Sequence, residues 1–126
     1  MPSEHEEQKT LFQWAAIRAK GRPELGLLLA IPNGGMRSKI TAAKLKAEGV
    51  KSGVPDVCLP VRTEQYGSLW IELKRPGERG RPAGRVSPEQ SRWIADLQIA
   101  GQCAAICFGW EEARDIIEAY LMQEPR

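Results

Sequence analysis

The sequence predicts an α/β protein in which helices cover both faces of a mixed central sheet. Its 126 residues fit one domain of common size, at 1–126. Hydrophobic residues make up 42% and charged residues 27% of the chain, as in globular proteins. Short apolar runs typical of strands alternate with longer segments of helical periodicity, in the order α-β-α-β-β-α-β-α. Strands interleaved with helices in this way favour a sheet that is covered on both faces.

The first half of the chain predicts a helix, a short strand and a second helix. Residues 3–20 have helical periodicity and end at a Gly-Arg-Pro sequence that breaks a helix. The continuous apolar run over 27–31 predicts a strand buried on both faces. A short basic helix then follows, capped by Ser38 or Thr41, and it stops at Gly49.

The second half predicts a hairpin, a loop, and a helix–strand–helix unit. Strands over 56–61 and 69–74 are joined by a polar loop, as in a hairpin. The glycine- and arginine-rich segment 75–86 predicts a mobile loop. Ser87 and the proline after it predict the start of a helix that runs to about residue 100, with Trp93 in the core. The remaining elements are a strand over 103–108 and a helix over 110–122.

The three cysteines indicate buried, reduced thiols in a cytoplasmic protein. Cys103 and Cys107 lie on one face of an expected strand about 13 Å apart, too far for a disulfide. An odd count argues against a disulfide framework, and His5 is the only histidine, which disfavours a zinc site. No apolar run approaches ~18 residues, and the acidic N-terminal segment does not resemble a signal peptide. We therefore expect neither membrane anchoring nor secretion.

Positive charge is concentrated in the middle of the chain. The net charge is +2, but five basic residues and one glutamate lie in each of the segments 37–51 and 74–85. Both ends of the chain are acidic. Central basic segments favour a polyanionic partner such as a nucleic acid, although solvated faces with chance clustering give the same pattern.

The segment Leu69–Lys74 carries the residues with the clearest chemistry. Period-two alternation places Trp70, Glu72 and Lys74 on one face of the expected strand. The hairpin partner starts at Asp56, so two carboxylates can share one patch and attract a hard ion such as Mg2+. Such an ion polarises a phosphodiester, and Lys74 could position water or stabilise developing charge. A cross-strand salt bridge, with Trp70 as packing, is the plain alternative.

The spacing of these residues resembles the core motif of the PD-(D/E)xK nuclease superfamily. Gly53-Val-Pro-Asp56 is followed, after fifteen residues, by Glu72-Leu-Lys74. With three further motifs in order, the chain is similar to the VRR-NUC family, the virus-type replication-repair nucleases found as small phage proteins and within larger repair enzymes. The resemblance covers residues 3 to about 108 and implies a restriction-endonuclease-like fold. The other motifs are Ser3-Glu4-His-Glu-Glu-Gln8, Ile31-Pro-Asn-Gly-Gly35 and Ser87-Pro-Glu-Gln90.

The resemblance implies a role for each matching residue. Asp56 and Glu72 match the metal-binding carboxylates, and the backbone carbonyl of Leu73 would join them. Lys74 matches the catalytic lysine. Gln90 matches a glutamine that orients a ligand or a water.

The glutamate of the first helix is ambiguous, because Glu4, Glu6 and Glu7 lie close together. Helical spacing from Leu11 and Ala15 puts Glu4 on the buried stripe and Glu7 beside it. We therefore assign Glu4 to the catalytic site and keep Glu7 as the second choice. All three could instead only favour the positive end of the helix.

Two basic segments are expected to contact DNA. The glycines after Asn33 would let backbone N–H groups approach a phosphate, and basic residues follow at once. The loop over 77–85 could track a nucleic-acid backbone. A plain turn and a disordered loop are the alternatives. The predicted DNA-binding residues are Asn33, Gly34, Arg37, Lys39, Arg79, Arg81 and Arg85.

The function implied is a Mg2+- or Mn2+-dependent DNA endonuclease in the cytoplasm of a bacterium or a phage-infected host. The resemblance further implies branched or flapped DNA as substrate, Holliday junctions among them, and a homodimer. A catalytically silent DNA-binding module is one alternative, and the complete set of motif residues argues against it. Another is an interaction subunit that works through the acidic C-terminal helix, residues 111–123.

Overall fold

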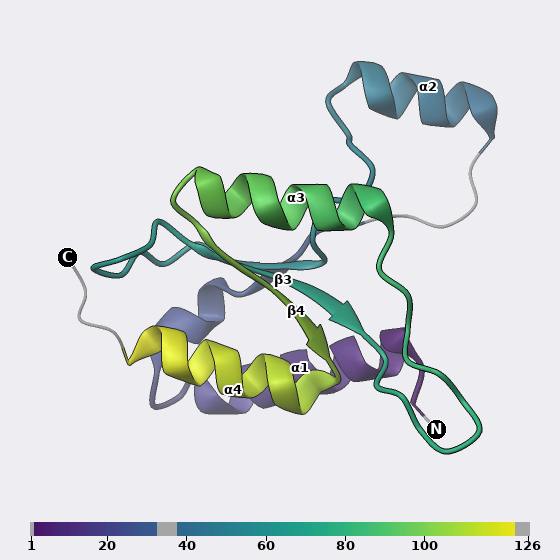
Figure 1. Ribbon diagram of the computed structural model, residues 1–126. Helices are drawn as coiled ribbons and strands as arrows, with labels where there is room; N and C mark the ends of the chain where they lie inside the picture. The colour runs from purple at the N-terminus through teal and green to yellow at the C-terminus, as the bar shows by residue number, and fades with distance from the viewer. Residues whose placement is uncertain (1, 33–37, 123–126) are drawn as a thin grey trace.

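The computed structural model describes residues 2–32 and 38–122 and contains a four-stranded mixed sheet with helices on both faces (Figure 1). Helix α3 covers one face, while α1 and α4 lie side by side on the other. The expected order of elements and the mixed sheet are confirmed. The elements are α1 (Glu4–Arg18), a 3-10 helix η1 (Pro23–Leu27), β1 (Leu29–Ala30), α2 (Lys39–Ala47), β2 (Val57–Leu59), β3 (Leu69–Lys74), α3 (Pro88–Ile99), β4 (Cys103–Phe108) and α4 (Trp110–Leu121).

The strands lie in the order β1-β2-β3-β4. Strands β2 and β3 form the expected antiparallel hairpin, in which Val57 is paired with Ile71. Strand β4 runs parallel to β3, and α3 is the connection between them. This register brings the carboxyl end of β3 next to the start of β2, where the motif residues lie.

Strand β1 differs from the expectation. The sequence predicted a strand over 27–31 buried on both faces, whereas only Leu29 and Ala30 pair with β2, and both are exposed. The apolar residues that reach the core are instead Leu25 and Leu28. Pro32 has no N–H to continue the ladder, and β1 is an edge strand, so one of its sides stays open.

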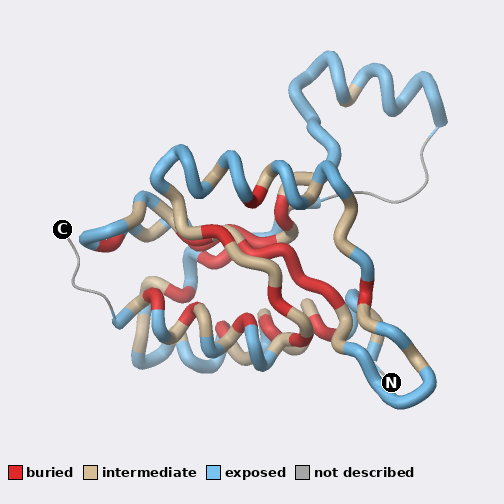
Figure 2. Tube along the Cα trace, in the orientation of Figure 1, coloured by how far each residue is buried: buried red, intermediate tan, exposed pale blue. Residues whose placement is uncertain are grey.

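The core lies between the sheet and the helix pair α1 and α4 (Figure 2). One face of β3 supplies Leu69, Ile71 and Leu73 to it, and all three are almost fully buried. Burial of each such side chain stabilises the fold by about 1.5–3 kcal/mol. Since alternate residues point to opposite faces, Glu72 and Lys74 must then lie on the α3 side.

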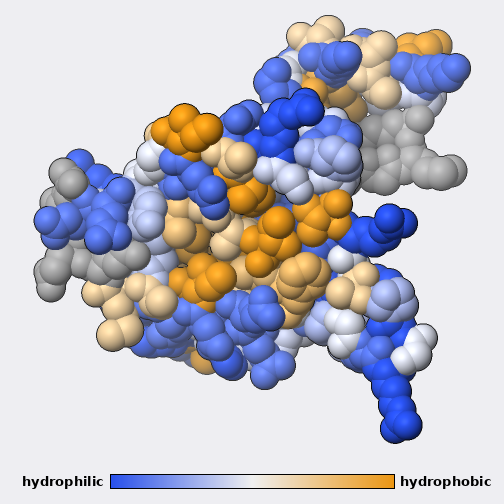
Figure 3. All heavy atoms as spheres, viewed as in Figure 1, coloured by the Kyte–Doolittle hydropathy of each residue, from blue (hydrophilic) through white to orange (hydrophobic). Residues whose placement is uncertain are grey.

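The outer edge of β4 is apolar and partly blocked. Hydrophobic side chains form a strip between α3 and α4, over this edge strand (Figure 3). The Gln98 amide donates to the Ala104 carbonyl at 3.0 Å, and the Phe108 N–H donates to Glu112 at 3.0 Å. These side chains occupy backbone groups that an open edge would offer to another strand.

The cysteines are free, and two of the three are buried as expected. Cys103, at the start of the edge strand β4, is only half-buried, which corrects the expectation of three buried thiols. Burial raises the pKa of the Cys107 thiol to about 12. This buried thiol is therefore protonated at neutral pH and inert.

Helix α2 stands away from the rest of the molecule (Figure 1). Ser38 caps it by accepting from the Thr41 N–H at 3.1 Å, which settles which of the two residues is the cap. Most of its side chains are exposed, and Ile40 is 79% exposed. Among the described residues, no helix has both the length and the apolar character to cross a bilayer.

Candidate active site

One groove of about 1030 Å3 contains all five side chains that the sequence assigned to catalysis. It lies between α2 and the open end of the β2–β3 hairpin, and the start of α3 lines it as well. The first turn of α1, the loop before β2, strand β3 and α3 each contribute to it. The five are Glu4, Asp56, Glu72, Lys74 and Gln90.

Asp56 is fixed at the end of the hairpin by its own side chain. Its Oδ2 accepts a hydrogen bond from the Leu73 N–H at 2.9 Å, and its carbonyl accepts from the Ile31 N–H at 2.8 Å. The preceding Pro55 has no N–H, so the hairpin ladder does not continue there. Because N–H and C=O of one strand residue point to the same side, the Leu73 carbonyl is also turned toward Asp56.

Glu72 and Lys74 form a buried ion pair on the α3 side of β3, as alternation predicted. Their side chains are 2% and 8% exposed, and Lys74 Nζ lies 3.5 Å from Glu72 Oε2. The same oxygen accepts from the Gln90 amide at 3.1 Å. The other oxygen, Glu72 Oε1, is buried and has no hydrogen-bond partner in the described part of the chain.

The start of α3 explains how Gln90 reaches Glu72. Ser87 accepts from the Gln90 N–H at 3.1 Å, and Gln90 Oε1 accepts from the Ser87 N–H at 2.8 Å, which is a capping box. The cap holds the oxygen end of the Gln90 amide. Its nitrogen end is thereby directed at Glu72.

Gly53 lets the loop before Asp56 pack closely against α3. Its φ is +85°, and a Cβ there would lie 2.8 Å from the Cβ of Glu89. Next to it, the Ser52 carbonyl accepts from the Trp93 indole N–H at 3.1 Å. Gly53, the glycine of the Gly-Val-Pro-Asp motif, therefore sets the distance between Asp56 and Gln90.

The electrostatics of the groove fit a divalent cation. Burial and the neighbouring Asp56 carboxyl group together raise the pKa of Glu72 to about 8, although Lys74 opposes the shift. The raised pKa and the unpartnered oxygen indicate that the single ammonium group of Lys74 does not balance the two neighbouring carboxyl groups. No group of three or more histidine, cysteine or acidic side chains that could hold a metal occurs among the described residues. The oxygen atoms that could hold such an ion are those of the Asp56 and Glu72 carboxylates and the Leu73 carbonyl, the kind of ligand that hard divalent cations take.

The two candidate glutamates of α1 have different surroundings. Glu7 is 5% exposed, and its Oε1 accepts from the Trp110 N–H at 2.8 Å. Since Gly109, the N-cap of α4, has no side chain, Glu7 of α1 supplies the missing cap. Glu4 is exposed and lines the groove beside Gly84. The expectation that Glu4 lies on the buried stripe is wrong: the stripe runs through Glu7, Leu11 and Ala15.

The predicted DNA-binding residues lie in three places. Asn33, Gly34 and Arg37 are outside the described residues. Lys39, the first residue of α2, is exposed and does not line the groove. The arginines at 79, 81 and 85 lie on the loop after β3, which extends near the start of α1 (Figure 1).

The loop after β3 has local order of its own. Glu78 and Arg81 form a β-bridge with backbone hydrogen bonds of 2.8 and 2.9 Å. Gly84 donates to the Arg75 carbonyl at 3.0 Å, and a Cβ there would lie 2.6 Å from Glu4 Oε2. The loop is thus closed at its base, against the groove.

Several groove residues were not assigned to the site from the sequence. Trp93 was expected in the core but is half-buried and lines the groove, where its indole binds the Ser52 carbonyl. Its position three residues after Gln90, on the same helix face, was the available signal. Trp70 donates to Ser68 at 2.9 Å and is not among the groove residues. The basic groove residues are Lys46, Lys51, Lys74 and Arg92.

Comparisons with known proteins identify one family. A sequence model described as "VRR-NUC domain" matches residues 4–110. A solved structure described as "VRR_NUC domain protein" is 27% identical, with a TM-score of 0.80, and the match covers 99% of this chain and 93% of that one. No curated protein matches significantly. The chain therefore belongs to the VRR-NUC family, a nuclease family of the PD-(D/E)xK type.

Proposed function

We propose that this protein is a Mg2+- or Mn2+-dependent endodeoxyribonuclease whose active site is the groove around Glu72. The observation that carries the proposal is the buried Glu72 carboxyl group, with one oxygen unpartnered beside Asp56 and the other held by Lys74 and Gln90. Asp56, Glu72 and the Leu73 carbonyl would hold the ion. When bound, the ion supplies polarisation of the phosphodiester and a lowered pKa for water.

Each remaining group has a defined task in this proposal. Gln90 holds Glu72 Oε2, which leaves Oε1 for the ion. Lys74 presents its ammonium group beside the carboxylates, where it stabilises charge on the phosphate oxygens or positions the attacking water. Glu4 lines the groove beside Gly84, in the loop that packs on the Lys74 stem, and acts as a positioning residue.

The substrate that we propose is branched or flapped DNA, cut by a homodimer of single-domain chains in the cytoplasm of a bacterium or a phage-infected host. The basic side chains of the groove and of the loop after β3 support a nucleic-acid partner. Substrate preference would come from DNA shape and backbone contacts.

A plasmid-nicking assay tests the proposed reaction. We expect nicking with Mg2+ or Mn2+, none with excess chelator, and DNA binding without nicking in Ca2+. The matched variant Glu72→Gln keeps the shape of the side chain and removes its charge, so it should abolish nicking. Full activity in excess chelator would refute the metal site, and binding without nicking under every condition would indicate a silent DNA-binding module.

A further inference from the structure

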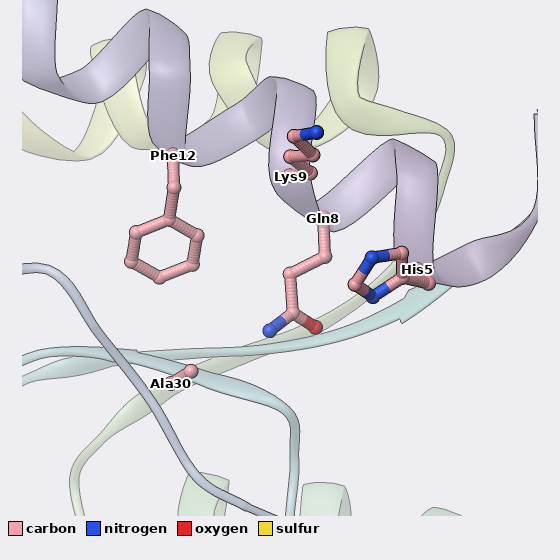
Figure 4. A pocket seen from close by; sticks show the side chains of 5 residues that line it. All are labelled: His5, Gln8, Lys9, Phe12 and Ala30. Atoms are coloured by element: carbon pink, nitrogen blue, oxygen red, sulfur yellow. The ribbon is translucent and has the colours of Figure 1, made fainter.

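A second cavity lies beside the groove, between α1 and the edge strand β1 (Figure 4). Its volume is about 260 Å3, below the range of roughly 300–1,000 Å3 that holds drug-sized ligands, so it suits a single small ring. The Gln8 amide projects between the Phe12 ring and the His5 imidazole, toward Ala30 (Figure 4). The lining residues are His5, Gln8, Lys9, Phe12 and Ala30.

The cavity and the groove are built on the same two elements. On α1, Glu4 lines the groove and Gln8 lines the cavity, a separation of about 6 Å along the helix axis. On the chain leaving β1, Ala30 lines the cavity and Pro32 lines the groove, about 6–7 Å apart for extended backbone. Both separations are of the order of one nucleotide in an extended strand. A strand with a phosphate at the edge of the groove lined by Glu4 and Pro32 would therefore reach the cavity with a neighbouring nucleotide.

The lining chemistry fits an unstacked nucleobase. Phe12 is half-buried against the core and offers a fixed ring, and His5 offers a second ring. The Gln8 amide has donors and an acceptor, which match the polar edge of a base. Lys9 is exposed at the rim of the cavity, with its ammonium group directed away from the Gln8 amide (Figure 4). Aromatic rings and an amide are groups that proteins use to bind the bases of single strands.

We propose that this cavity binds one unpaired nucleobase next to the phosphate that is cut. The inference rests on the proposed nuclease function and adds to it a requirement for an unpaired nucleotide on one side of the cut. Duplex DNA lacks that free base. The cavity thus selects substrates with a single-stranded segment or a branch point at the cleavage position.

Equilibrium binding to substrates that lack a single base tests this proposal. A flapped DNA is prepared with one abasic residue at each position in turn around the cut, and its affinity is measured by fluorescence anisotropy in Ca2+. We expect one position to lose affinity about 5- to 150-fold, the cost of losing one stacked base. In Gln8→Leu and Phe12→Leu the abasic and intact substrates should bind alike. Phe12→Leu keeps an apolar side chain against the core, and Gln13→Leu, at an exposed residue of α1 that does not line the cavity, is the matched control.

The outcomes separate the two proposals. Equal affinity for every abasic substrate, in a protein that nicks the intact flap, refutes the cavity and leaves the nuclease assignment standing. A position-dependent loss that persists in Gln8→Leu and Phe12→Leu also refutes it, because the base is then bound elsewhere. A protein that neither binds nor nicks any DNA refutes both.

Discussion

At the scale of single residues, the site depends on one carboxyl group that is short of positive charge. Glu72 is buried among Asp56, Lys74 and Gln90, and only one of its oxygens has partners among the described residues. A buried ion pair adds little stability, because desolvation offsets the attraction between the charges. We therefore expect this pair to matter for chemistry more than for folding.

The variant Lys74→Met separates these two roles. We expect kcat to fall ~100-fold or more, about 3 kcal/mol of barrier, because the ammonium group no longer stabilises transition-state charge. The melting temperature at neutral pH should change little, since the aliphatic stem is kept and Glu72, with a pKa of about 8, already holds a proton in most molecules. Nicking rates and thermal melts of this one variant decide the matter. Nicking at the wild-type rate would remove Lys74 from the mechanism.

The raised pKa of Glu72 predicts a pH dependence of the metal-free protein. This pKa is about 8 in the folded chain against an ordinary 4.5, so the folded state holds a proton that the unfolded state has lost. Stability without metal should therefore fall as pH rises from about 4.5 to 8 and then level off. A divalent cation held by Glu72 would replace that proton, so the apparent Mg2+ affinity should rise with pH up to about 8.

Melting temperatures between pH 5 and 9, with and without Mg2+, measure both effects. In Glu72→Gln the fall in stability over that range should be reduced and the stabilisation by Mg2+ lost. If this variant keeps the wild-type pH profile, a different group titrates.

At the scale of elements, α1 contributes a side chain to each of two separate places, the start of α4 and the groove. Glu7 caps α4 through the Trp110 N–H, whereas Glu4, one turn earlier, lies in the groove. The start of α3 also has two roles, because the capping box that begins the helix also directs the Gln90 amide at Glu72. Helix starts thus bring the side chains of the site together.

Substituting Glu4 and Glu7 of α1 by alanine should have different effects on stability and on the nicking rate. Glu7→Ala leaves a helix N-terminus uncapped and should cost about 0.5–2 kcal/mol of stability, with a normal nicking rate well below the melting temperature. Glu4→Ala should leave the melting temperature nearly unchanged, lower the nicking rate about 10- to 100-fold and shift the half-saturating Mg2+ concentration. Thermal melts and Mg2+ titrations of both variants measure this. The opposite pattern would assign the catalytic role to Glu7.

At the scale of the whole molecule, positive charge lies around the groove on separate elements. Helix α2 and the loop before β2 contribute Lys46 and Lys51, and α3 contributes Arg92. The loop after β3 adds Arg79 and its neighbours near the start of α1. A backbone bound in the groove would therefore meet cations from several directions.

Neutralising Arg79, Arg81 and Arg85 together tests the contribution of the loop. Binding should weaken equally for all DNA sequences, and the slope of log affinity against log salt should shrink by roughly 2–3, about 0.9 per lost phosphate contact. Titrations at several salt concentrations give this slope, and neutralising Arg18, Lys20 and Arg114, none of which lines the groove or the cavity, is a charge-matched control. An unchanged slope would show that the loop does not contact the backbone.

The sequence by itself determined the local features of this protein. Alternation placed Glu72 and Lys74 on one face of β3, and the Ser-Pro-Glu-Gln motif marked the start of α3, because these periods and caps follow from backbone geometry alone. The order of the elements was predictable for the same reason.

Only the tertiary structure decided which elements meet. Leu29 lies exposed on an edge strand, Trp93 lines the groove, and Glu7 caps a helix that begins more than 100 residues away. No local sequence pattern predicts these three positions, because they depend on how α1, α3 and the sheet pack against each other. The periodicity of a sequence predicts the direction of a side chain relative to its own helix or strand. Which residue it contacts depends on how the elements pack.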